Sequence, residues 1–215
     1  VYEVGMSHLG MKILYHMLNE RDDTVCERVF APWTDMEEEM KRCGIPLLSL
    51  ESHRAVADFD IIGFTLQYEM SYSNVLNMLA LAGVPLKSSD RTEKYPFVCA
   101  GGPCAYNGEP LADIVDFFIL GEGEYVNNEI MDAYKEWKKT GESKTAFLEK
   151  IAKIEGIYVP SFYDVSYNDD GTVKSVVPNR DCAPKKIRKR IVKEMDDCFA
   201  LDKMIVPFMD IVHDR

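Results

Sequence analysis

The chain has 215 residues and a formal net charge of −11, with 47% hydrophobic and 28% charged residues. This composition is typical of a soluble globular protein and excludes intrinsic disorder and collagen-like order. The acidic balance argues against broad electrostatic binding to nucleic acid. The apolar runs are far shorter than the ~20 residues that a membrane-spanning helix needs, so we expect no membrane span.

The six cysteines indicate a reducing compartment. They form no Cys-x-x-Cys pair and show no zinc-finger spacing with histidine, and the chain opens with no secretory signal. We therefore expect reduced thiols, a cytoplasmic location and no structural zinc.

Residues 1–48 are predicted to form alternating strands and helices. Val1–Val4 is expected to be the end of a strand that starts upstream and leads directly into Gly5. The apolar spacing that follows, with its period near 3.6, predicts a helix packed on one face. In chain order we expect a helix over residues 6–18, a strand over 24–30, an acidic helix over 33–42 that stops at Gly44, and a short strand over 45–48.

The clearest strand signal is Asp60–Thr65, an apolar run without alternation, which is typical of a parallel strand covered on both faces. The expected elements after it are a helix over 69–82, a strand over 95–100, a short helix over 109–114, a strand over 117–120 and a helix over 121–139. This alternation predicts βαβ units, and so a flavodoxin-like (Rossmann-like) α/β fold with a doubly wound parallel sheet and helices on both faces.

The pattern changes near residue 156. Asn168–Gly171 lies between two alternating segments, which predicts a β-hairpin. The run Lys185–Arg190 is basic, and the tail after Pro207 has no clear period. We therefore divide the chain into an α/β domain over residues 1–155 and a β-hairpin appendage with an exit linker over 156–215.

Loops at the carboxyl ends of parallel strands are where open sheets bind ligands. Glycines in such loops allow close approach of a ligand, and free N–H groups at a helix start can hold an anion. The candidate cofactor-binding residues are Gly5, Met6, Ser7, His8, Gly10, Thr65, Leu66, Gln67, Gly101, Gly102, Pro103, Gly121, Glu122, Gly123 and Glu124. The alternative for each glycine is a tight turn with no ligand.

The residues of these loops limit the kinds of ligand that can bind there. No dinucleotide fingerprint and no phosphate-binding P-loop occurs. Glu122 and Glu124 at a helix start repel an anion, which favours contacts to hydroxyl or amide groups over phosphate. His8 is the one histidine expected in the crevice, with a capping role as its alternative. No nucleophilic catalytic set assembles at fixed spacing, so we assign no catalytic residue and no metal ligand.

Three segments carry a family resemblance. They are Tyr2–Gly10, Ala100–Pro103 and Asp116–Glu124, of which the pairing of Gly-Gly-Pro with Gly-Glu-Gly-Glu is the most specific. Together they resemble the N-terminal cobalamin-binding-like region of radical S-adenosylmethionine (SAM) proteins, over residues 1–140 and, less sharply, in the tail. The resemblance implies a whole protein with a C-terminal radical barrel that holds S-adenosylmethionine and a [4Fe–4S] cluster, and a first domain that docks a corrinoid such as cobalamin.

Two departures limit what the resemblance implies. The Cys-x3-Cys-x2-Cys motif that holds such a cluster is absent, so the chain resembles a fragment that stops before the barrel. The Asp-x-His-x-x-Gly motif that ligates cobalt is also absent, because Met6 and Met11 flank His8 where Asp and Gly are needed. A corrinoid in this domain is therefore expected to lack a histidine ligand.

The leading hypothesis is a corrinoid-docking domain that is not catalytic by itself and belongs to a radical SAM enzyme. The alternative is a degenerate interaction module that binds no cofactor and docks a protein or RNA partner, with Lys186, Arg188 and Arg190 as contacts. A flavin- or nucleotide-binding enzyme fits the same fold and ranks last, because the loops lack a phosphate site rich in Ser and Thr.

Overall fold

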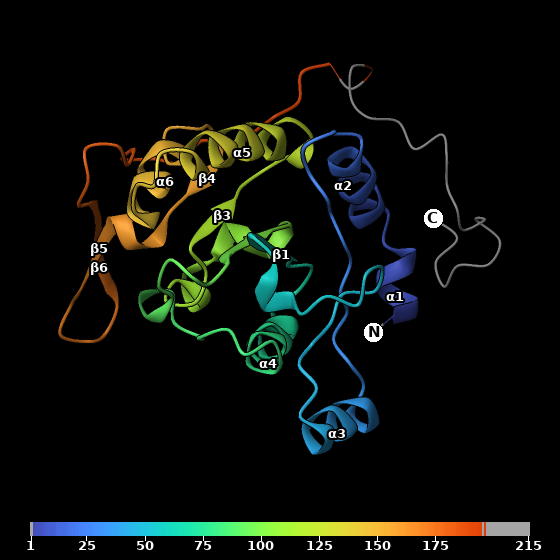
Figure 1. The fold of residues 1–215 in the computed structure, drawn as a ribbon. Helices are drawn as coiled ribbons and strands as arrows, with labels where there is room; N and C mark the ends of the chain where they lie inside the picture. The colour runs from blue at the N-terminus through green and yellow to red at the C-terminus, as the bar shows by residue number, and fades with distance from the viewer. Residues whose placement is uncertain (1, 195, 197–215) are drawn as a thin grey trace.

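A four-stranded sheet forms the centre of the computed structural model, which describes residues 2–194 and residue 196 (Figure 1). The strands run in the order β1 (Ile61–Thr65), β2 (Phe97–Gly101), β3 (Phe117–Ile119) and β4 (Ile157–Tyr158). The first three are parallel, and β4 pairs antiparallel with β3. This arrangement, with helices flanking the sheet, confirms the predicted α/β, Rossmann-like fold.

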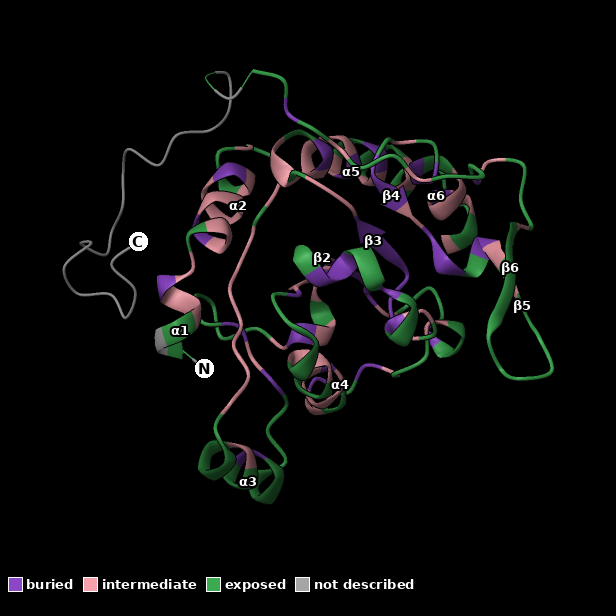
Figure 2. Ribbon diagram, turned by 180° about the vertical axis from the view of Figure 1, so that it is seen from behind, coloured by how far each residue is buried: buried purple, intermediate pink, exposed green. Residues whose placement is uncertain are grey.

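The two faces of the sheet bury separate apolar clusters. Side chains alternate along β3, so Phe118 packs toward α3 (Thr34–Cys43) and α4 (Tyr72–Leu81). Phe117 packs toward α5 (Gly123–Lys138) and α6 (Lys144–Ile151) on the other face. Figure 2 shows the buried residues of β2 and β3 between these layers.

The chain begins with two helices, α1 (Tyr2–Ser7) and α2 (Leu9–Asn19). The expected helix over 6–18 corresponds to α2, which contacts α5. The expected strand end at Val1–Val4 is wrong for this structure, because its described residues lie in α1. Tyr2 of α1 packs edge-on against Phe30, with ring centroids 5.8 Å apart.

Two further expected strands are absent from the described residues. Segment 24–30 is extended but pairs with no strand, and 45–48 contributes one isolated bridge, from Leu48 to Ala55. Extended residues form a β-strand only where a neighbouring strand hydrogen-bonds to their backbone N–H and C=O groups. The local pattern in 24–30 is therefore that of a strand without the required neighbour.

The strand β1 lies at the edge of the sheet and is less buried than its sequence predicts. Its residues Ile61–Thr65 pair with β2 on one side, and no described strand pairs with the other side. Gly63 in its centre is exposed. Ile62 packs in the apolar cluster on one face and Ile61 packs against the cluster on the other. The predicted position of β1 and its cover on two faces are therefore confirmed, but one edge of the strand is unpaired.

Two short turns replace the helix that was expected after β2. In place of the helix expected over 109–114, the structure has 3-10 turns at Pro103–Asn107 and Glu109–Leu111. Both start with proline in the first two positions, where its missing N–H does no harm, but the turns do not extend into an α-helix. The sequence interpretation also missed α6, which Ser143 caps by accepting a hydrogen bond from the N–H of Ala146.

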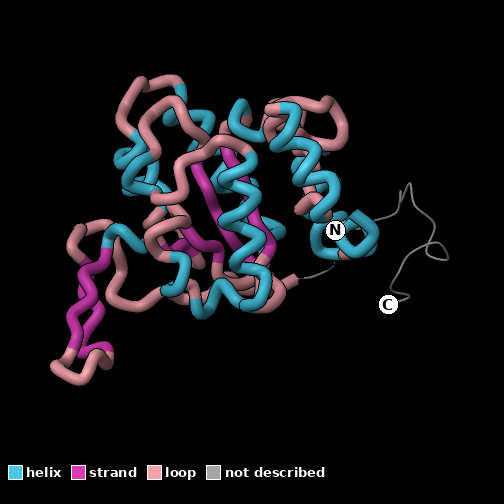
Figure 3. The backbone as a smooth tube through the Cα atoms, turned by 90° about the horizontal axis from the view of Figure 1, so that it is seen from below, coloured by secondary structure: helices cyan, strands magenta, loops and turns pink. Residues whose placement is uncertain are grey.

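The C-terminal part of the described chain contains the predicted hairpin. It consists of β5 (Tyr163–Tyr167) and β6 (Val173–Pro178), which are largely exposed and project from the body of the protein (Figure 3). β4 belongs to the main sheet, although the sequence division places it in the appendage. The division at residue 155 stays a prediction, and the tail after Pro207 lies outside the described residues.

Candidate functional site

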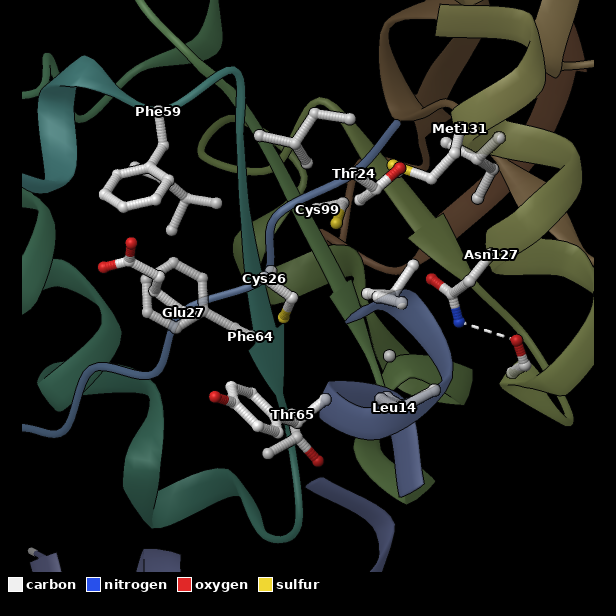
Figure 4. A pocket seen from close by; sticks show the side chains of 18 of the residues that line it. Leu14, Thr24, Cys26, Glu27, Phe59, Phe64, Thr65, Cys99, Asn127 and Met131 are labelled. Carbon is white, nitrogen blue, oxygen red and sulfur yellow. Dashed lines mark hydrogen bonds between the residues drawn. The ribbon is translucent and has the colours of Figure 1, made fainter. Parts of the chain in front are cut away.

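A cavity of about 810 Å³ lies between α2, the extended segment 24–29, β1 and α5. Its walls are largely apolar, with Leu14 from α2, Phe64 from β1 and Met131 from α5 among the lining residues (Figure 4). Cys26 lines the cavity from the extended segment, which runs past β1. The cavity reaches the carboxyl ends of β1, β2 and β3, where an open parallel sheet binds its ligands.

Most of the predicted site residues meet at this cavity. The ones that line it are His8, Gly10, Thr65, Gln67, Gly101, Gly102, Gly121, Gly123 and Glu124. The remaining candidates, which do not line it, are Gly5, Met6, Ser7, Leu66, Pro103 and Glu122. The first three of these lie in α1, because no strand precedes them in the structure, and Leu66 is fully buried below the loop.

Two of the loop glycines are required by the chain itself. A Cβ atom on Gly102 would lie 2.8 Å from the carbonyl oxygen of Leu66, and one on Gly121 would lie 2.1 Å from that of Arg190. Both have positive φ, +98° and +107°, which L side chains rarely adopt. Close backbone packing thus accounts for these glycines without any ligand.

His8 caps helix α2. It is the N-cap residue, and its ring atom Nδ1 accepts a hydrogen bond of 3.1 Å from the N–H of Met11. An acceptor in this position satisfies one of the free N–H groups at the helix start. The capping role that the sequence left open is therefore what the structure shows for Nδ1, while the residue also borders the cavity.

Among the described residues that line the cavity, only Glu124 has a buried side-chain oxygen or nitrogen without a hydrogen-bond partner. It lies in the first turn of α5, directly after Gly123. Its Oε2 is buried and has no hydrogen-bond partner among the described residues. A buried carboxylate oxygen without a donor costs free energy, so this atom is an open acceptor at the cavity wall.

Glu122 has a different role from Glu124. Its Oε2 accepts a hydrogen bond from the N–H of Val192, outside the cavity. The neighbouring Arg190 pairs with Glu129, and its backbone forms a parallel bridge to Gly121. Arg190 therefore fastens the C-terminal segment to the site, whereas Lys186 and Arg188 of the predicted basic contact surface are exposed.

The polar wall of the cavity was missed by the sequence interpretation. The guanidinium of Arg28 lies over the ring of Tyr15, 4.4 Å from its centroid, and its Nε is 2.8 Å from Oε1 of Glu51. Burial, with Glu51 nearby, raises the pKa of Cys26 to about 11. The thiol is therefore protonated at neutral pH and is a poor nucleophile or metal ligand. No local motif marks this cluster.

Asp23 joins α2 to α5 at the cavity rim. Lys135 lies 2.6 Å from its Oδ2 and Arg21 lies 3.0 Å from its Oδ1. These hydrogen bonds, that of Lys135 first, hold the pKa of Asp23 well below its usual range. The stability that Asp23 contributes is thus fully present above the ordinary carboxyl pKa of ~3.9 and is lost as the pH falls below it.

We expect Asp23→Asn to lower the melting temperature by about 1–2 °C at pH 6. The difference from the unsubstituted chain should shrink as the pH falls from 4 to 2, because the aspartate of the unfolded chain is then protonated and the pH approaches the lowered pKa of Asp23 in the folded chain. Thermal unfolding followed by circular dichroism at pH 6 and at pH 2 measures the difference in melting temperature. Asp22→Asn, at the exposed neighbouring position, is the control, and equal pH dependence of the two variants would contradict the assignment.

The described residues offer no metal centre. Among them, no group of three or more His, Cys, Asp or Glu side chains is placed to hold a metal ion. Burial, with Asp116 nearby, raises the pKa of Cys99 to about 12, so this thiol is also protonated. An iron–sulfur cluster therefore does not fit this part of the chain. Among the described helices, none combines the length and the apolar character that a membrane span requires.

Comparison with known proteins identifies the family. The family of N-terminal regions of radical SAM proteins matches residues 10–160. MJ0966, an uncharacterized protein of Methanocaldococcus jannaschii, is 36% identical over 76 residues, which are 35% of this chain and 16% of that protein. The chain thus spans a small part of this relative. No solved structure gives a significant match. Because the family match covers more than half of its residues, the chain belongs to the N-terminal regions of radical SAM proteins.

Proposed function

We propose that this region docks a corrinoid in the cavity at the strand ends, without a histidine ligand to the cobalt. The observation that carries the proposal is the unpartnered Oε2 of Glu124, which is buried at the wall of a large, mostly apolar cavity. Cofactor sites are usually cavities with mostly apolar walls, and 810 Å³ lies in the upper part of their usual range of ~300–1,000 Å³.

The chemistry of the walls suits a corrinoid better than a nucleotide. A corrin ring is broad and apolar on its faces and has carboxamide groups at its periphery. Leu14, Phe64 and Met131 supply apolar contacts, and the carboxylate of Glu124 accepts a hydrogen bond from an amide N–H. The same carboxylate, in the first turn of α5, repels phosphate.

The absence of a histidine ligand follows from the role of His8. Its Nδ1 is used to cap α2, and residues that would complete the known cobalt-ligating motif are missing around it. We therefore assign to this chain the tasks of holding the corrin ring and shielding it from water. The corrinoid, when bound, supplies a cobalt centre that can carry a methyl group.

The rest of the protein supplies the catalytic centre in this proposal. Membership of the family implies a radical barrel with S-adenosylmethionine and a [4Fe–4S] cluster, whose Cys-x3-Cys-x2-Cys motif does not occur in this sequence. The barrel is the partner of this domain, and RNA, a protein or a small molecule is its substrate.

A reducing, cytoplasmic location is also part of the proposal. It is supported by the free thiols among the described residues, which are Cys26, Cys43, Cys99, Cys104 and Cys182.

The carboxylate of Glu124 provides a specific test. Glu124→Gln replaces a charge-assisted hydrogen bond with a neutral one, a loss of about 1 kcal/mol. We expect the Kd for hydroxocobalamin to rise about fivefold. The matched control is Glu122→Gln, because the amide oxygen still accepts from the N–H of Val192 outside the cavity. Absorbance titration of both variants measures the difference.

An unchanged Kd for Glu124→Gln would remove the residue from the site. An equal loss in both variants would also count against the proposal, because it would reflect the acidic loop as a whole. If neither variant nor the unsubstituted chain binds any corrinoid, the alternative of an interaction module that docks a protein or RNA replaces the proposal. The exposed cations Lys186 and Arg188 are then the first contacts to neutralise, with Arg190 left in place because it is structural.

A further inference from the structure

A glycine occupies the centre of β1, where it lines the cavity described above. Glycine in the interior of a strand weakens it, because the residue loses more conformational freedom on folding and has no side chain to pack. It usually marks a bulge, a bend at a barrel corner or a place where another group approaches the backbone closely. The register of β1 with β2 is unbroken through Gly63, and the sheet is open, so neither a bulge nor a barrel corner explains this glycine.

The packing of the chain itself does not require glycine at position 63. Among the described residues, a Cβ atom there would have one neighbour within 4 Å, the Sγ of Cys99 at 3.6 Å, which is an ordinary van der Waals distance. Gly63 also lacks the positive φ that favours glycine. Gly102 and Gly121 differ on both points, since backbone atoms crowd their Cβ positions and their φ is positive. The backbone at position 63 could therefore carry a side chain.

Position 63 faces the side of the sheet that α5 covers. Side chains alternate along a strand, and Ile62 packs in the cluster on the α3 and α4 face, whereas Ile61 packs against the cluster on the α5 and α6 face. Cys99, the partner of Gly63 on β2, belongs to the second cluster and lines the cavity as well (Figure 4). At Gly63 the cavity is therefore bounded by bare backbone, with a thiol beside it.

The surroundings of Gly63 suit an uncharged, apolar group. The thiol of Cys99, with its pKa of about 12, is uncharged at neutral pH. The side chains that lie on the same face and line the cavity are apolar, namely Ile61, Phe117, Ile130 and Met131. A charged group placed here would lose its hydration without gaining a partner. The group that approaches the backbone of β1 is therefore apolar.

A flat ring makes the largest contact with bare backbone. Dispersion attraction weakens steeply once a gap of about 0.5–1 Å opens between two surfaces, so the two shapes must match. A strand without a side chain presents its peptide groups directly to a flat surface. A separate observation in the same cavity, the buried Oε2 of Glu124 without a hydrogen-bond partner among the described residues, indicates a hydrogen-bond donor on the same ligand.

We propose that Gly63 is a specificity-determining residue of the cavity, because its missing side chain lets the flat, apolar face of a ring lie against the backbone of β1. The ligand class is an uncharged ring system with apolar faces and hydrogen-bond donors at its edge. For the corrinoid of the proposed function, the corrin ring supplies this face, and that part rests on the proposed function. The role of Gly63 itself requires only a flat ring.

Gly63→Val tests this role by stability and by binding. In urea unfolding we expect the variant to be at least as stable as the unsubstituted chain, because valine favours strands and its Cβ meets no close backbone atom. We expect the Kd for hydroxocobalamin to rise at least about tenfold, since the valine methyl groups stand between the ring and the strand. The Kd for Nile red, a flat uncharged dye, should rise by a similar factor in a fluorescence titration.

Val98→Ala is the matched control on the neighbouring strand. Its side chain packs in the cluster on the other face and does not line the cavity, so stability should fall while both Kd values stay within about twofold.

Lower stability of Gly63→Val would overturn the proposal, because the fold itself would then need the glycine. Unchanged Kd values for both probes would also overturn it. If the unsubstituted chain binds Nile red but not hydroxocobalamin, and Gly63→Val weakens the dye, the corrinoid is rejected and the role of Gly63 is kept. If the unsubstituted chain binds neither probe, both proposals are rejected.

Discussion

Asp116→Ala should lower the free energy of unfolding by about 3–5 kcal/mol. Asp116 is 8% exposed, and its Oδ2 lies 3.1 Å from Nη2 of Arg91, whose side chain is fully buried. The same oxygen accepts a hydrogen bond of 2.7 Å from the N–H of Val98 on β2. Burial raises the pKa of Asp116, and the charge of Arg91 acts in the opposite direction. Without the carboxylate, the guanidinium keeps its charge in the core without a counterion.

The remaining partners of Arg91 cannot replace the carboxylate. Its Nη1 donates to the carbonyls of Pro85 and Leu86, both at 2.9 Å, and its Nη2 to that of Ile114. Carbonyl oxygens solvate the cation but carry no net charge. Urea unfolding followed by circular dichroism measures the effect. Asp113→Ala, an exposed position nearby, should change stability by less than about 0.5 kcal/mol, and equal losses for the two variants would contradict the role of the ion pair.

Gly121→Ala should cost about 3 kcal/mol or more, because two effects combine. The residue has a φ of +107°, a conformation that strains any L side chain by about 1–3 kcal/mol. A Cβ there would also lie 2.1 Å from the carbonyl oxygen and 2.6 Å from the nitrogen of Arg190. These are the backbone atoms that bond to Glu122 and Leu120, at 3.1 and 2.8 Å. The C-terminal segment must therefore move away from the sheet.

Gly141→Ala separates the strain from the clash. Gly141 has a φ of +69° and open space around its Cβ position, so only the conformational cost of about 1 kcal/mol applies. Chemical denaturation of both variants measures the difference. Similar losses at the two positions would show that the contact with Arg190 is unimportant. A bulky residue at Gly121 is consequently a poor probe of ligand binding, since it displaces the chain whether or not a ligand is present.

The parts of the fold predicted from the sequence are those that local patterns determine. The apolar runs of β1, β2 and β3 correspond to strands of the main sheet, and the periodic stripe of α5, including Val126 and Ile130, corresponds to the buried face of that helix. The end of α3 at Gly44 was also predicted, and in the structure this glycine is the left-handed C-cap residue. Each of these signals is contained within a few residues of the element that it describes.

The parts that could not be predicted depend on distant partners. Segment 24–30 has a strand pattern, but a strand also needs a neighbour to pair with, and the sequence does not show which one is present. Position 121 needs glycine because the backbone of Arg190, which is distant in the sequence, leaves no room for a Cβ atom. The two glutamates of the Gly-Glu-Gly-Glu loop look equivalent in sequence, yet Glu122 bonds to Val192 while Glu124 borders the cavity.

The most direct test of the proposed function is a titration of the chain with hydroxocobalamin and with methylcobalamin, followed by absorbance and by heat release. We expect saturable binding of one corrinoid per chain, with the same spectrum of the bound form in the unsubstituted chain and in His8→Asn. Asparagine keeps the cap on α2 but removes the imidazole. Absence of any spectral or thermal change with both corrinoids would contradict the proposal of a docking site. A bound spectrum that changes with His8→Asn would contradict docking without a histidine ligand.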